Sequence, residues 1–302
     1  MAEHMVRVED RCIVCDGSVF EEVYPATFEG SWQEAVPYFL TDRRMAVHGR
    51  ILRCGNCGFV LTSPQFRPED YFRIYENLTV DTGNAGRERA GRLRFNRLGA
   101  LVRQHVAGGR LLDLGCGNGA FLREMEDFVS VGFEPRRGAT TGTEDLIAGD
   151  FIEYCHAEGG DAAGTFDAVT AWDVLEHLPA LDSYLAKVNR LLKKDGMFFA
   201  TLPDIESAAA RLSGRRWNCI LLEHLWYFSP RTFQRYVARF GFTVVKNASF
   251  GFPVDIGTLL ERLGQIYGLP VPWRMRWLTG TTVTLPIGLM FVACRKEQEV
   301  SA

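Results

Sequence analysis

Two pairs of cysteines near the start of the chain have the spacing of a metal site. Cys12 and Cys15 are separated by two residues, as are Cys54 and Cys57. Four thiolates in two such pairs can surround one Zn²⁺ ion tetrahedrally and leave no coordination position open to water. A CxxC pair can also serve redox chemistry, but neither pair stands next to the βαβ pattern that accompanies that use. We therefore predict a structural zinc site at these four residues.

Two glutamate–histidine pairs could act in acid–base chemistry. Glu176 and His177 follow a predicted strand at 166–173, and Glu223 and His224 lie in an aromatic-rich segment. A neutral imidazole can accept a proton near neutral pH, and an adjacent carboxylate can orient it. Ligands of open parallel sheets bind beyond the carboxyl ends of the strands, so we expect His177 to face a pocket. Each histidine is a candidate base. For His224 a hydrogen-bonded core histidine is the alternative.

A glycine-rich turn follows a short apolar run in the stretch 111–122, which reads LLDLGCGNGAFL. Gly115, Gly117 and Gly119 allow the backbone to approach a ligand closely. We expect a strand before the turn and, after it, a helix that opens at about Gly119, whose free N–H groups can hold a carboxylate. Asp113 at the end of the strand can take an ammonium group. The turn therefore suits an amino-acid moiety, because its GxGxG spacing departs from the GxGxxG of dinucleotide sites.

Two acidic residues downstream of the turn suit a nucleoside. Glu134 ends the apolar run 131–134 about twenty residues after the turn, where a carboxylate can accept bonds from both ribose hydroxyls. Asp150 and Phe151 follow another short apolar run and offer a carboxylate for an exocyclic amine and a ring for an adenine face. A nucleoside joined to an amino acid is S-adenosylmethionine, which we therefore expect as the cofactor.

These motifs, in this order, resemble those of the class I S-adenosylmethionine-dependent methyltransferases. The resemblance is carried by LLDLGCGNGAFL, VGFE, GDF, FDAVTAWDVLEHL and LKKDGMFFATLP and covers roughly residues 110–203. It implies an α/β fold with a Rossmann-like, doubly wound seven-stranded sheet, whose last strand runs antiparallel and whose closing pair is 242–250 and 289–296. It also implies the cofactor-binding residues Asp113, Gly115, Cys116, Gly117, Gly119, Glu134, Asp150, Phe151, Trp172 and Asp173.

Two narrower resemblances concern the glutamate–histidine pairs. The segment DVLEH at 173–177 resembles the ExxEH segment of the ubiquinone-pathway O-methyltransferases, where a metal is thought to help ionise a catechol hydroxyl. It implies that Asp173, Glu176 and His177 could share a divalent cation on one helix face, with helix capping and pocket lining as the metal-free alternative. The EHxxYFS pattern at 223–229 resembles the zinc-containing sugar C-methyltransferases of antibiotic pathways, in which such a histidine is thought to act as the base.

The remaining pattern divides the chain into three parts. Residues 1–68 hold both cysteine pairs and end in a proline-bounded stretch, so we predict a small zinc-ribbon-like domain there. Residues 69–106 have apolar residues at helical spacing and are expected to form connector or lid helices. Residues 107–302 alternate short apolar runs with helical stretches, which indicates a mainly parallel sheet and a methyltransferase domain. Within this part, the segment 253–286 is expected to form a lid or dimer element.

Composition excludes several other classes of protein. The 302 residues carry 34 Lys and Arg against 37 Asp and Glu, and this formal net charge of −3 argues against a dedicated nucleic-acid binder. No apolar run approaches the roughly 20 residues of a membrane span. The opening MAEHMVRVED lacks the apolar core of a secretory signal, so we expect a cytoplasmic protein. A basic run could hold a phosphorylated acceptor, or form a solvated helix face, and consists of Arg87, Arg89, Arg92, Arg94 and Arg97.

Together these features predict a biosynthetic enzyme that moves a methyl group from S-adenosylmethionine to an oxygen or carbon nucleophile of a small molecule. A sugar C-methyltransferase acting on a nucleotide-linked keto sugar is the alternative within that chemistry. A nicotinamide-dependent oxidoreductase is disfavoured by the glycine spacing. A zinc-ribbon adaptor with a catalytically silent cofactor-binding domain is disfavoured by the two glutamate–histidine pairs. We expect no nucleic-acid partner and no membrane span, and a homodimer is compatible with the 253–286 segment.

Overall fold

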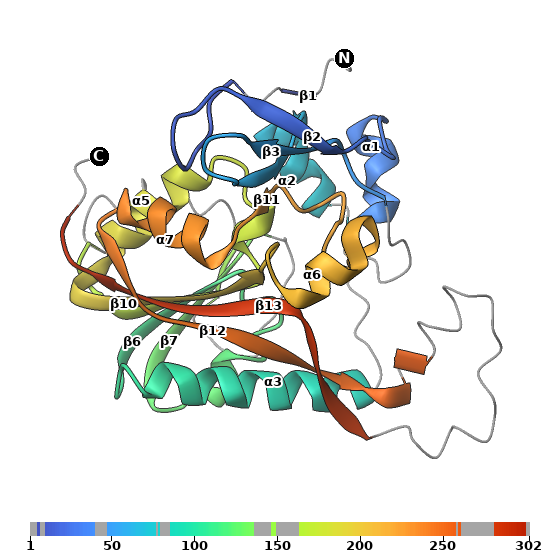
Figure 1. Ribbon diagram of the computed structural model, residues 1–302. Coiled ribbons are helices and arrows are strands. Elements are labelled where there is room, and N and C mark those ends of the chain that lie inside the picture. Colours follow the sequence, from blue (N-terminus) through green and yellow to red (C-terminus); the bar gives the residue numbers. More distant parts are fainter. Residues whose placement is uncertain are drawn as a thin grey trace.

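The computed structural model describes residues 5–6, 10–39, 47–76, 78, 85–135, 146–148, 163–257, 259–260 and 281–299. Its centre is a seven-stranded sheet in the order β12-β13-β10-β9-β6-β7-β8 (Figure 1). Five neighbouring strands of this sheet, β10, β9, β6, β7 and β8, run parallel, whereas β13 runs antiparallel to both β10 and β12. This confirms the predicted doubly wound sheet with an antiparallel last strand. The strands are β6 (Gly109–Leu114), β7 (Phe128–Glu134), β8 (Leu146–Ala148), β9 (Phe166–Trp172), β10 (Leu192–Pro203), β12 (Phe242–Asp255) and β13 (Thr282–Lys296).

The central strands are covered on both faces, which is why they appear in the sequence as nearly continuous apolar runs. Side chains alternate along a strand, so Phe198 and Phe199 of β10 point into different hydrophobic clusters. The Phe198 cluster contains residues of the helices above the sheet in Figure 1, and the Phe199 cluster contains Leu98 and Val102 of the helix below it. The helices that contribute to the Phe198 cluster are α5 (Leu181–Leu191) and α7 (Pro230–Ala238), and the helix below is α3 (Ala85–Arg103). Helix α6 (Ala208–Ser213) contributes Ala210 to the Phe199 cluster.

The described residues of the region 69–106 form two helices, as predicted. Helix α2 (Pro68–Glu76) begins at a proline and has two acidic residues in its first turn, both of which favour a helix start. Helix α3 packs under the sheet and buries Leu98 and Val102 completely. The two helices therefore have different surroundings, since α3 is part of the core while α2 contributes rings to the pocket described below.

The prediction of a helix that opens at about Gly119 is wrong. The glycine turn leads only into one turn of 3₁₀ helix, η2 (Leu122–Glu124), before β7 begins. The Asn118 side chain accepts a bond from the N–H of Ala120 at 3.2 Å, and Gly119 has a φ of +71°. These local bonds and the left-handed backbone favour a turn over a helix. Anion binding by a helix N-terminus is therefore not a property of this turn.

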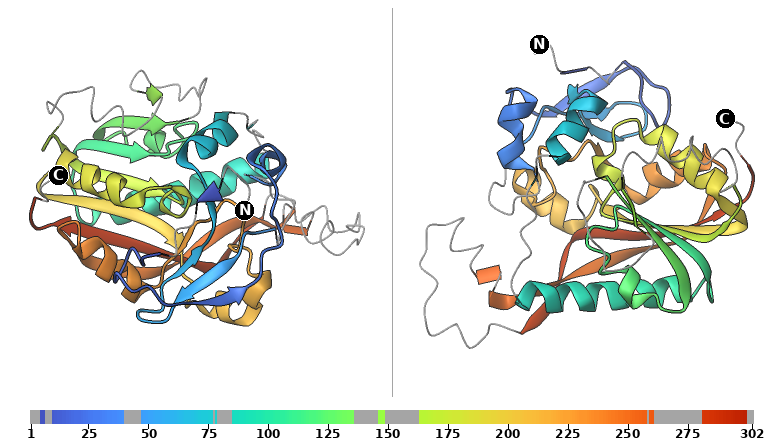
Figure 2. Two further views of the ribbon diagram at one scale, coloured as in Figure 1. Left: turned by 90° about the horizontal axis from the view of Figure 1, so that it is seen from above. Right: turned by 180° about the vertical axis from the view of Figure 1, so that it is seen from behind.

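A second sheet of four strands lies against the larger one, in the order β11-β4-β3-β2 (Figure 2). Three of its strands come from the cysteine-containing region: β2 (Phe20–Tyr24), β3 (Ile51–Cys54) and β4 (Val60–Thr62). The fourth, β11 (Trp226–Tyr227), comes from the predicted methyltransferase domain, 107–302, and pairs with β4. The smaller elements here are the pair β1 (Met5–Val6) and β5 (Gln65–Phe66) and the helices α1 (Trp32–Ala35) and η1 (Val36–Tyr38). The proposed boundary near residue 68 is thus bridged by a shared sheet.

The last two strands form a long hairpin that extends beyond the sheet. β12 and β13 stay paired as far as Asp255 and Thr282, so both run into the predicted 253–286 segment (Figure 1). The rest of that segment, from 261 to 280, lies outside the described residues, and its role as a lid or dimer element stays a prediction. Among the helices the structure describes, none has the length and apolar character to cross a bilayer.

Candidate functional site

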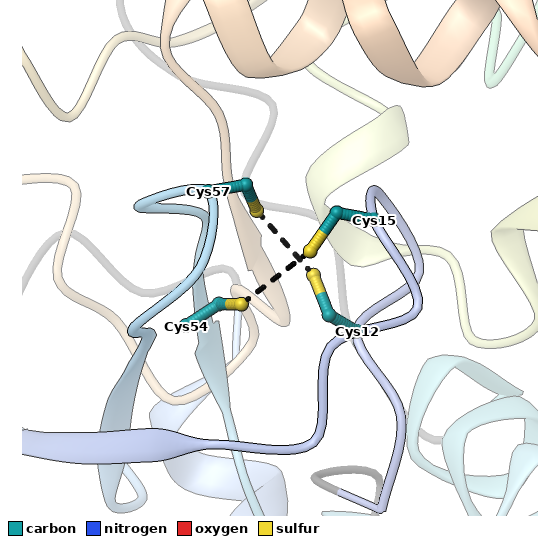
Figure 3. Close-up of side chains that lie close together, drawn as sticks. All are labelled: Cys12, Cys15, Cys54 and Cys57. Atoms are coloured by element: carbon teal, nitrogen blue, oxygen red, sulfur yellow. Dashed lines mark hydrogen bonds between the residues drawn. The ribbon is translucent and has the colours of Figure 1, made fainter.

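The four cysteines of the predicted zinc site lie together (Figure 3). The Sγ atoms of Cys12 and Cys57 are 3.6 Å apart, as are those of Cys15 and Cys54, and all four sulfurs lie within 4.8 Å of one another. A thiolate tetrahedron with Zn–S bonds of about 2.3 Å has sulfur–sulfur edges of about 3.8 Å. All four residues are free cysteines. The arrangement therefore fits a Zn²⁺ ion.

The surroundings of these thiols support the same interpretation. The side-chain N–H of Asn56 donates to the Sγ of Cys15 at 3.3 Å, and such outer bonds orient metal ligands. Gly58, directly after Cys57, has a φ of +81°, a conformation that glycine adopts without steric cost. The second cysteine pair thus lies in a tight turn of the kind a metal knuckle requires.

The glycine turn is connected directly to the predicted ribose acid. Gly115, Gly117 and Gly119 all have left-handed backbone angles, with φ of +67°, +57° and +71°. A Cβ atom at Gly115 would lie 2.6 Å from the Cγ2 of Val174. The N–H of Gly117 donates to the Oε2 of Glu134 at 2.9 Å. A ligand that touches the turn would therefore also meet the Glu134 carboxylate.

Asp113 lies beneath the turn at the end of β6 and is 2% exposed. The hydroxyl of Thr170 donates to its Oδ1 at 2.6 Å. Burial raises the pKa of Asp113 to about 7, and the nearby Glu134 adds to the rise, while Thr170 and Arg94 oppose it. A cation bound at the turn would favour the charged carboxylate, as expected for a group that meets an ammonium.

One pocket joins the glycine turn to the first histidine. Its walls contain Gly115, Glu134, Asp173 and His177 among mostly apolar and aromatic side chains. It is lined by Tyr71, Phe72, Tyr75, Leu114, Gly115, Phe133, Glu134, Pro135, Asp173, Val174, His177, Leu178, Pro179 and Tyr184. Apolar walls with a few convergent polar groups are typical of small-molecule sites.

Other predicted cofactor residues do not line this pocket. Cys116 is buried and packs against β7, where a Cβ atom on Gly132 would lie 2.6 Å from its sulfur. Trp172 packs edge-on against Phe121, with ring centroids 5.1 Å apart. The positions 150 and 151 lie outside the described residues. The placement of Asp150 and Phe151 at an adenine therefore stays a prediction.

Arg94 is a site residue that the sequence interpretation did not single out. Its Nη2 donates to the Oδ2 of Asp173 at 2.6 Å, and the hydroxyl of Thr201 donates to the Oδ1 of Asp173 at 2.6 Å. The Arg94 side chain is 13% exposed, and its Nε has no partner among the described residues. Its spacing from Leu98 and Val102, four and eight residues, places it on the buried face of α3. That periodicity could have separated Arg94 from the other arginines of the run.

The predicted helix face of Asp173, Glu176 and His177 does not form. Asp173 has a φ of +54° and precedes a single 3₁₀ turn, η3 (Leu175–His177). Its carboxylate is engaged by Arg94, as described above. The structure brings a different set together, since Glu176, His177 and His224 each offer a ligand atom within 4.8 Å of the others. The structure therefore does not place Asp173, Glu176 and His177 on one helix face, and the second set is Glu176, His177 and His224.

The two histidines come from distant parts of the sequence and meet edge to face. Their ring centroids are 4.6 Å apart. The Nδ1 of His224 lies 2.8 Å from the carbonyl oxygen of Cys219, so Nδ1 carries the proton and Nε2 carries the lone pair. Burial first, and then the neighbouring His177, keep the pKa of His224 well below its usual value. His224 is thus a neutral imidazole with an available Nε2.

Burial affects the acids and phenols around the histidines in the same direction. Desolvation, followed by the charge of Asp173, raises the pKa of Glu176 well above its usual value. Desolvation, followed by the charge of Glu223, raises the pKa of Tyr75. Glu223 itself is 7% exposed. The predicted partner acids therefore surround the histidines in a largely water-free environment.

The small sheet anchors the His224 segment. The hydroxyl of Thr62 donates to the carbonyl oxygen of His224 at 2.8 Å, and the N–H of Thr62 donates to the carbonyl oxygen of Leu225 at 2.9 Å. Phe59, two residues after the last cysteine of the zinc site, packs against Trp226, with ring centroids 6.2 Å apart. The cysteine cluster, β4 and His224 thus form one continuous packed unit.

Comparison with known proteins identifies a methyltransferase domain. Residues 86–247 match the profile of a family described as "Methyltransferase domain". The chain is 33% identical over 120 residues to the ubiquinone biosynthesis O-methyltransferase of Burkholderia orbicola (strain MC0-3), covering 35% of this chain and 50% of that protein. It is 33% identical over 148 residues to the enzyme of the same name from Escherichia coli O9:H4 (strain HS), covering 45% and 58%. The match thus spans little more than half of these relatives.

A solved structure is also similar in fold. It is a SAM-dependent methyltransferase from Archaeoglobus fulgidus with 21% sequence identity and a TM-score of 0.49. The similarity covers 68% of this chain and 94% of that one.

Proposed function

We propose, from the premise that this chain belongs to the methyltransferase domain family, that it transfers a methyl group from S-adenosylmethionine to an oxygen or carbon nucleophile of a small molecule. One observation carries the proposal. One pocket contains Gly115 of the glycine turn, the Glu134 carboxylate and His177, so it offers a cofactor site and a proton acceptor side by side. Methyl transfer needs the cofactor and the proton-accepting group in contact with the same methyl-acceptor molecule.

Residues in the pocket and next to it support S-adenosylmethionine as the cofactor. The left-handed glycine turn admits the cofactor close to the backbone, and the Glu134 carboxylate, which already meets that turn, is placed for the ribose hydroxyls. Asp113 lies beneath the turn with its pKa raised by burial, and a bound ammonium group would favour its charged carboxylate. Arg94, whose Nε has no partner among the described residues, suits the methionine carboxylate. Asp150 and Phe151 remain our proposal for the adenine.

The chain's own groups would align the reactants and remove a proton. A sulfonium methyl is already a strong electrophile, so the protein has to exclude water and place the nucleophile in line with the methyl carbon and sulfur. Tyr71, Phe72 and Tyr75 from α2 provide walls that exclude water from the pocket. His177 lines the pocket and its ring meets that of His224, so these two imidazoles are our candidates for the group that accepts the proton of an acceptor hydroxyl or C–H group, with Glu176 and Glu223 beside them.

Two acceptor classes follow from the comparisons and the sequence. The named relatives are O-methyltransferases, which favours a phenolic or catecholic hydroxyl. The meeting of His177 with the EHxxYFS histidine, His224, favours instead a nucleotide-linked keto sugar, whose carbon becomes nucleophilic when a proton is removed. Both fit a small-molecule acceptor in a biosynthetic pathway.

The purified full-length chain, incubated with methyl-labelled S-adenosylmethionine and each acceptor class, tests the proposal. We expect label in the product of one class and formation of S-adenosylhomocysteine in equal amount. Loss of label from the cofactor without any methylated product, across both classes, would contradict transfer to these acceptors.

We also propose that the four cysteines hold one structural zinc ion. Elemental analysis of the purified chain is expected to give one zinc per molecule. Cys54→Ser should remove it and lower the thermal unfolding temperature, because the small sheet then loses its cross-link. Cys294→Ala, which changes a buried cysteine of β13 outside the cluster, is the matched control and should keep the zinc. Zinc retained in Cys54→Ser would contradict the site.

The contact between Thr62 and His224 predicts a separable effect on turnover. Thr62→Val preserves the side-chain shape but removes the donor to the His224 carbonyl. We expect kcat to fall about tenfold while the affinity for S-adenosylmethionine stays unchanged, because the loss of one buried hydrogen bond allows the His224 segment to shift. Thr62→Ser should restore kcat. An equal loss in the serine and valine variants would argue against this positioning role.

A further inference from the structure

A compact group of three side chains lies next to the pocket and consists of Glu176, His177 and His224. One oxygen or nitrogen atom from each lies within 4.8 Å of the others. Glu176 is 1% exposed and His224 is 6% exposed, while His177 reaches the pocket. The group therefore has one side enclosed by protein and one side open toward the space where an acceptor would bind.

Two polar atoms of this group are buried without a partner. The Oε2 of Glu176 and the Nδ1 of His177 make no hydrogen bond to any residue that the structure describes. A buried polar atom without a partner is costly, and native proteins rarely leave one unless an ion, a water or a ligand completes the site. Both atoms belong to side chains that also share the short distances of the cluster. A single bound ion or molecule between the two side chains would therefore complete both atoms.

The third ligand atom is already oriented. The Nδ1–H of His224 donates to the carbonyl oxygen of Cys219 at 2.8 Å, which leaves Nε2 as a lone pair. Metal-ligating histidines usually donate their other ring N–H to such an acceptor, which fixes the tautomer and the ring orientation. Cys219 thus has the position of an outer-shell partner through its backbone.

The backbone holds the two halves of the group in register. The N–H of Leu225 donates to the carbonyl oxygen of Glu176 at 2.7 Å, and the indole N–H of Trp226 donates to the carbonyl oxygen of Leu178 at 2.8 Å. Thr62 fixes His224 from the other side, as described above. A site built on such fixed segments holds its ligand atoms in place before a cation arrives.

We propose that Glu176, His177 and His224 bind one divalent cation, distinct from the zinc of the four cysteines, and that the open side of this cation receives an oxygen of the methyl acceptor. Two histidines and one carboxylate form a common catalytic metal set, and it leaves coordination positions for a substrate. The inference deepens the proposed function and rests on it for the acceptor. The ligand set differs from the one expected from sequence spacing, because Arg94 and Thr201 occupy Asp173.

As ligands, His177 and His224 would act on the acceptor through the cation and would not accept its proton themselves. Such a cation would stabilise the oxyanion of an acceptor hydroxyl bound through its oxygen, so that a water molecule could take the proton. The oxyanion would then attack the methyl carbon, the carbon–sulfur bond would break, and the electron pair would stay on sulfur. The sulfonium charge and the oxyanion charge are both neutralised in this step, so no oxidant or reductant is needed.

The test measures binding of Mn²⁺ alone to the zinc-loaded full-length chain. Free Mn²⁺ is counted by its electron paramagnetic resonance signal, and the cysteine site does not compete because thiolates select zinc over this harder cation. We expect one Mn²⁺ per chain, and a second equivalent of Zn²⁺ should displace it. Failure of both Mn²⁺ and a second Zn²⁺ to bind would overturn the proposal.

Single substitutions identify the ligands. Glu176→Gln and His224→Ala should each weaken Mn²⁺ binding by more than about tenfold, since even outer-shell changes at metal sites cost 10- to 100-fold. Asp173→Asn should leave Mn²⁺ affinity unchanged, which separates this site from the one based on sequence spacing. The exposed His105→Ala is the matched histidine control. Wild-type Mn²⁺ affinity in Glu176→Gln and His224→Ala, or its loss in Asp173→Asn, would overturn the assignment.

Calorimetry with S-adenosylmethionine in the same samples separates this inference from the proposed function. Glu176→Gln, His224→Ala and His105→Ala should bind the cofactor if they are folded, so a chain that binds cofactor but no second metal ion contradicts only the metal site. A chain that binds Mn²⁺ as expected but no cofactor contradicts only the proposed function.

Discussion

Gly117→Arg is expected to abolish binding of S-adenosylmethionine. Gly117 has a φ of +57°, and its N–H donates to Glu134 at 2.9 Å. An arginine there would strain the backbone by about 1–2 kcal/mol and fill the approach to the turn. It would also add a positive charge beside a cofactor whose sulfonium is positive. We expect affinity to fall at least about 100-fold, equivalent to about 2.7 kcal/mol, measured by titration calorimetry.

Gly91→Arg is the matched control for this change. Gly91 lies on α3, and a Cβ atom there would meet no atom within 4 Å. The same glycine-to-arginine change should therefore leave cofactor binding and the unfolding temperature close to those of the wild type. Equal cofactor affinity in Gly117→Arg and Gly91→Arg would show that the glycine turn does not form the cofactor site.

His224→Ala is expected to spare cofactor binding and to lower turnover by about 10²- to 10⁴-fold, the usual contribution of a positioned acid–base group. His224 is buried and does not line the pocket directly, so its removal leaves the glycine turn and Glu134 in place. The same direction is expected whether the imidazole accepts the proton or binds a cation. Initial rates and calorimetry on one preparation measure both quantities.

His105→Ala serves as the control for turnover, because His105 is exposed at the end of α3, near Phe199 of the sheet and away from the pocket. It should keep wild-type rates. Full turnover in His224→Ala would contradict a role for this histidine in the reaction, and lost cofactor binding would place it in the cofactor site instead.

The features that the sequence predicted well are those encoded by local pattern. The central strands are buried on both faces, so each appears as an apolar run, and their order follows from alternation with helices. The four cysteines were recognisable because CxxC spacing alone brings two thiols of each pair together. The glycine turn was recognisable for the same reason. The helix after it was not predicted correctly, because the side chain of Asn118 caps a turn that glycine spacing does not reveal.

The features that the sequence could not predict depend on contacts between distant segments. His177 and His224 meet because Leu225 bonds to the backbone of Glu176 and because β11 pairs with β4. Neither contact follows from a regular spacing of residues in the sequence, so neither could be predicted from it. Asp173 looked like a partner of His177 by helical spacing, but its left-handed backbone and Arg94 direct its carboxylate elsewhere. The site is therefore set by tertiary contacts around a framework that local patterns do encode.

Titration of the purified full-length chain with S-adenosylmethionine tests the central claim most directly, since every assigned role depends on a cofactor held between the glycine turn and Glu134. The account predicts one binding event per chain with measurable heat, and a rise in unfolding temperature at saturating cofactor. The absence of heat together with an unchanged unfolding temperature would contradict it.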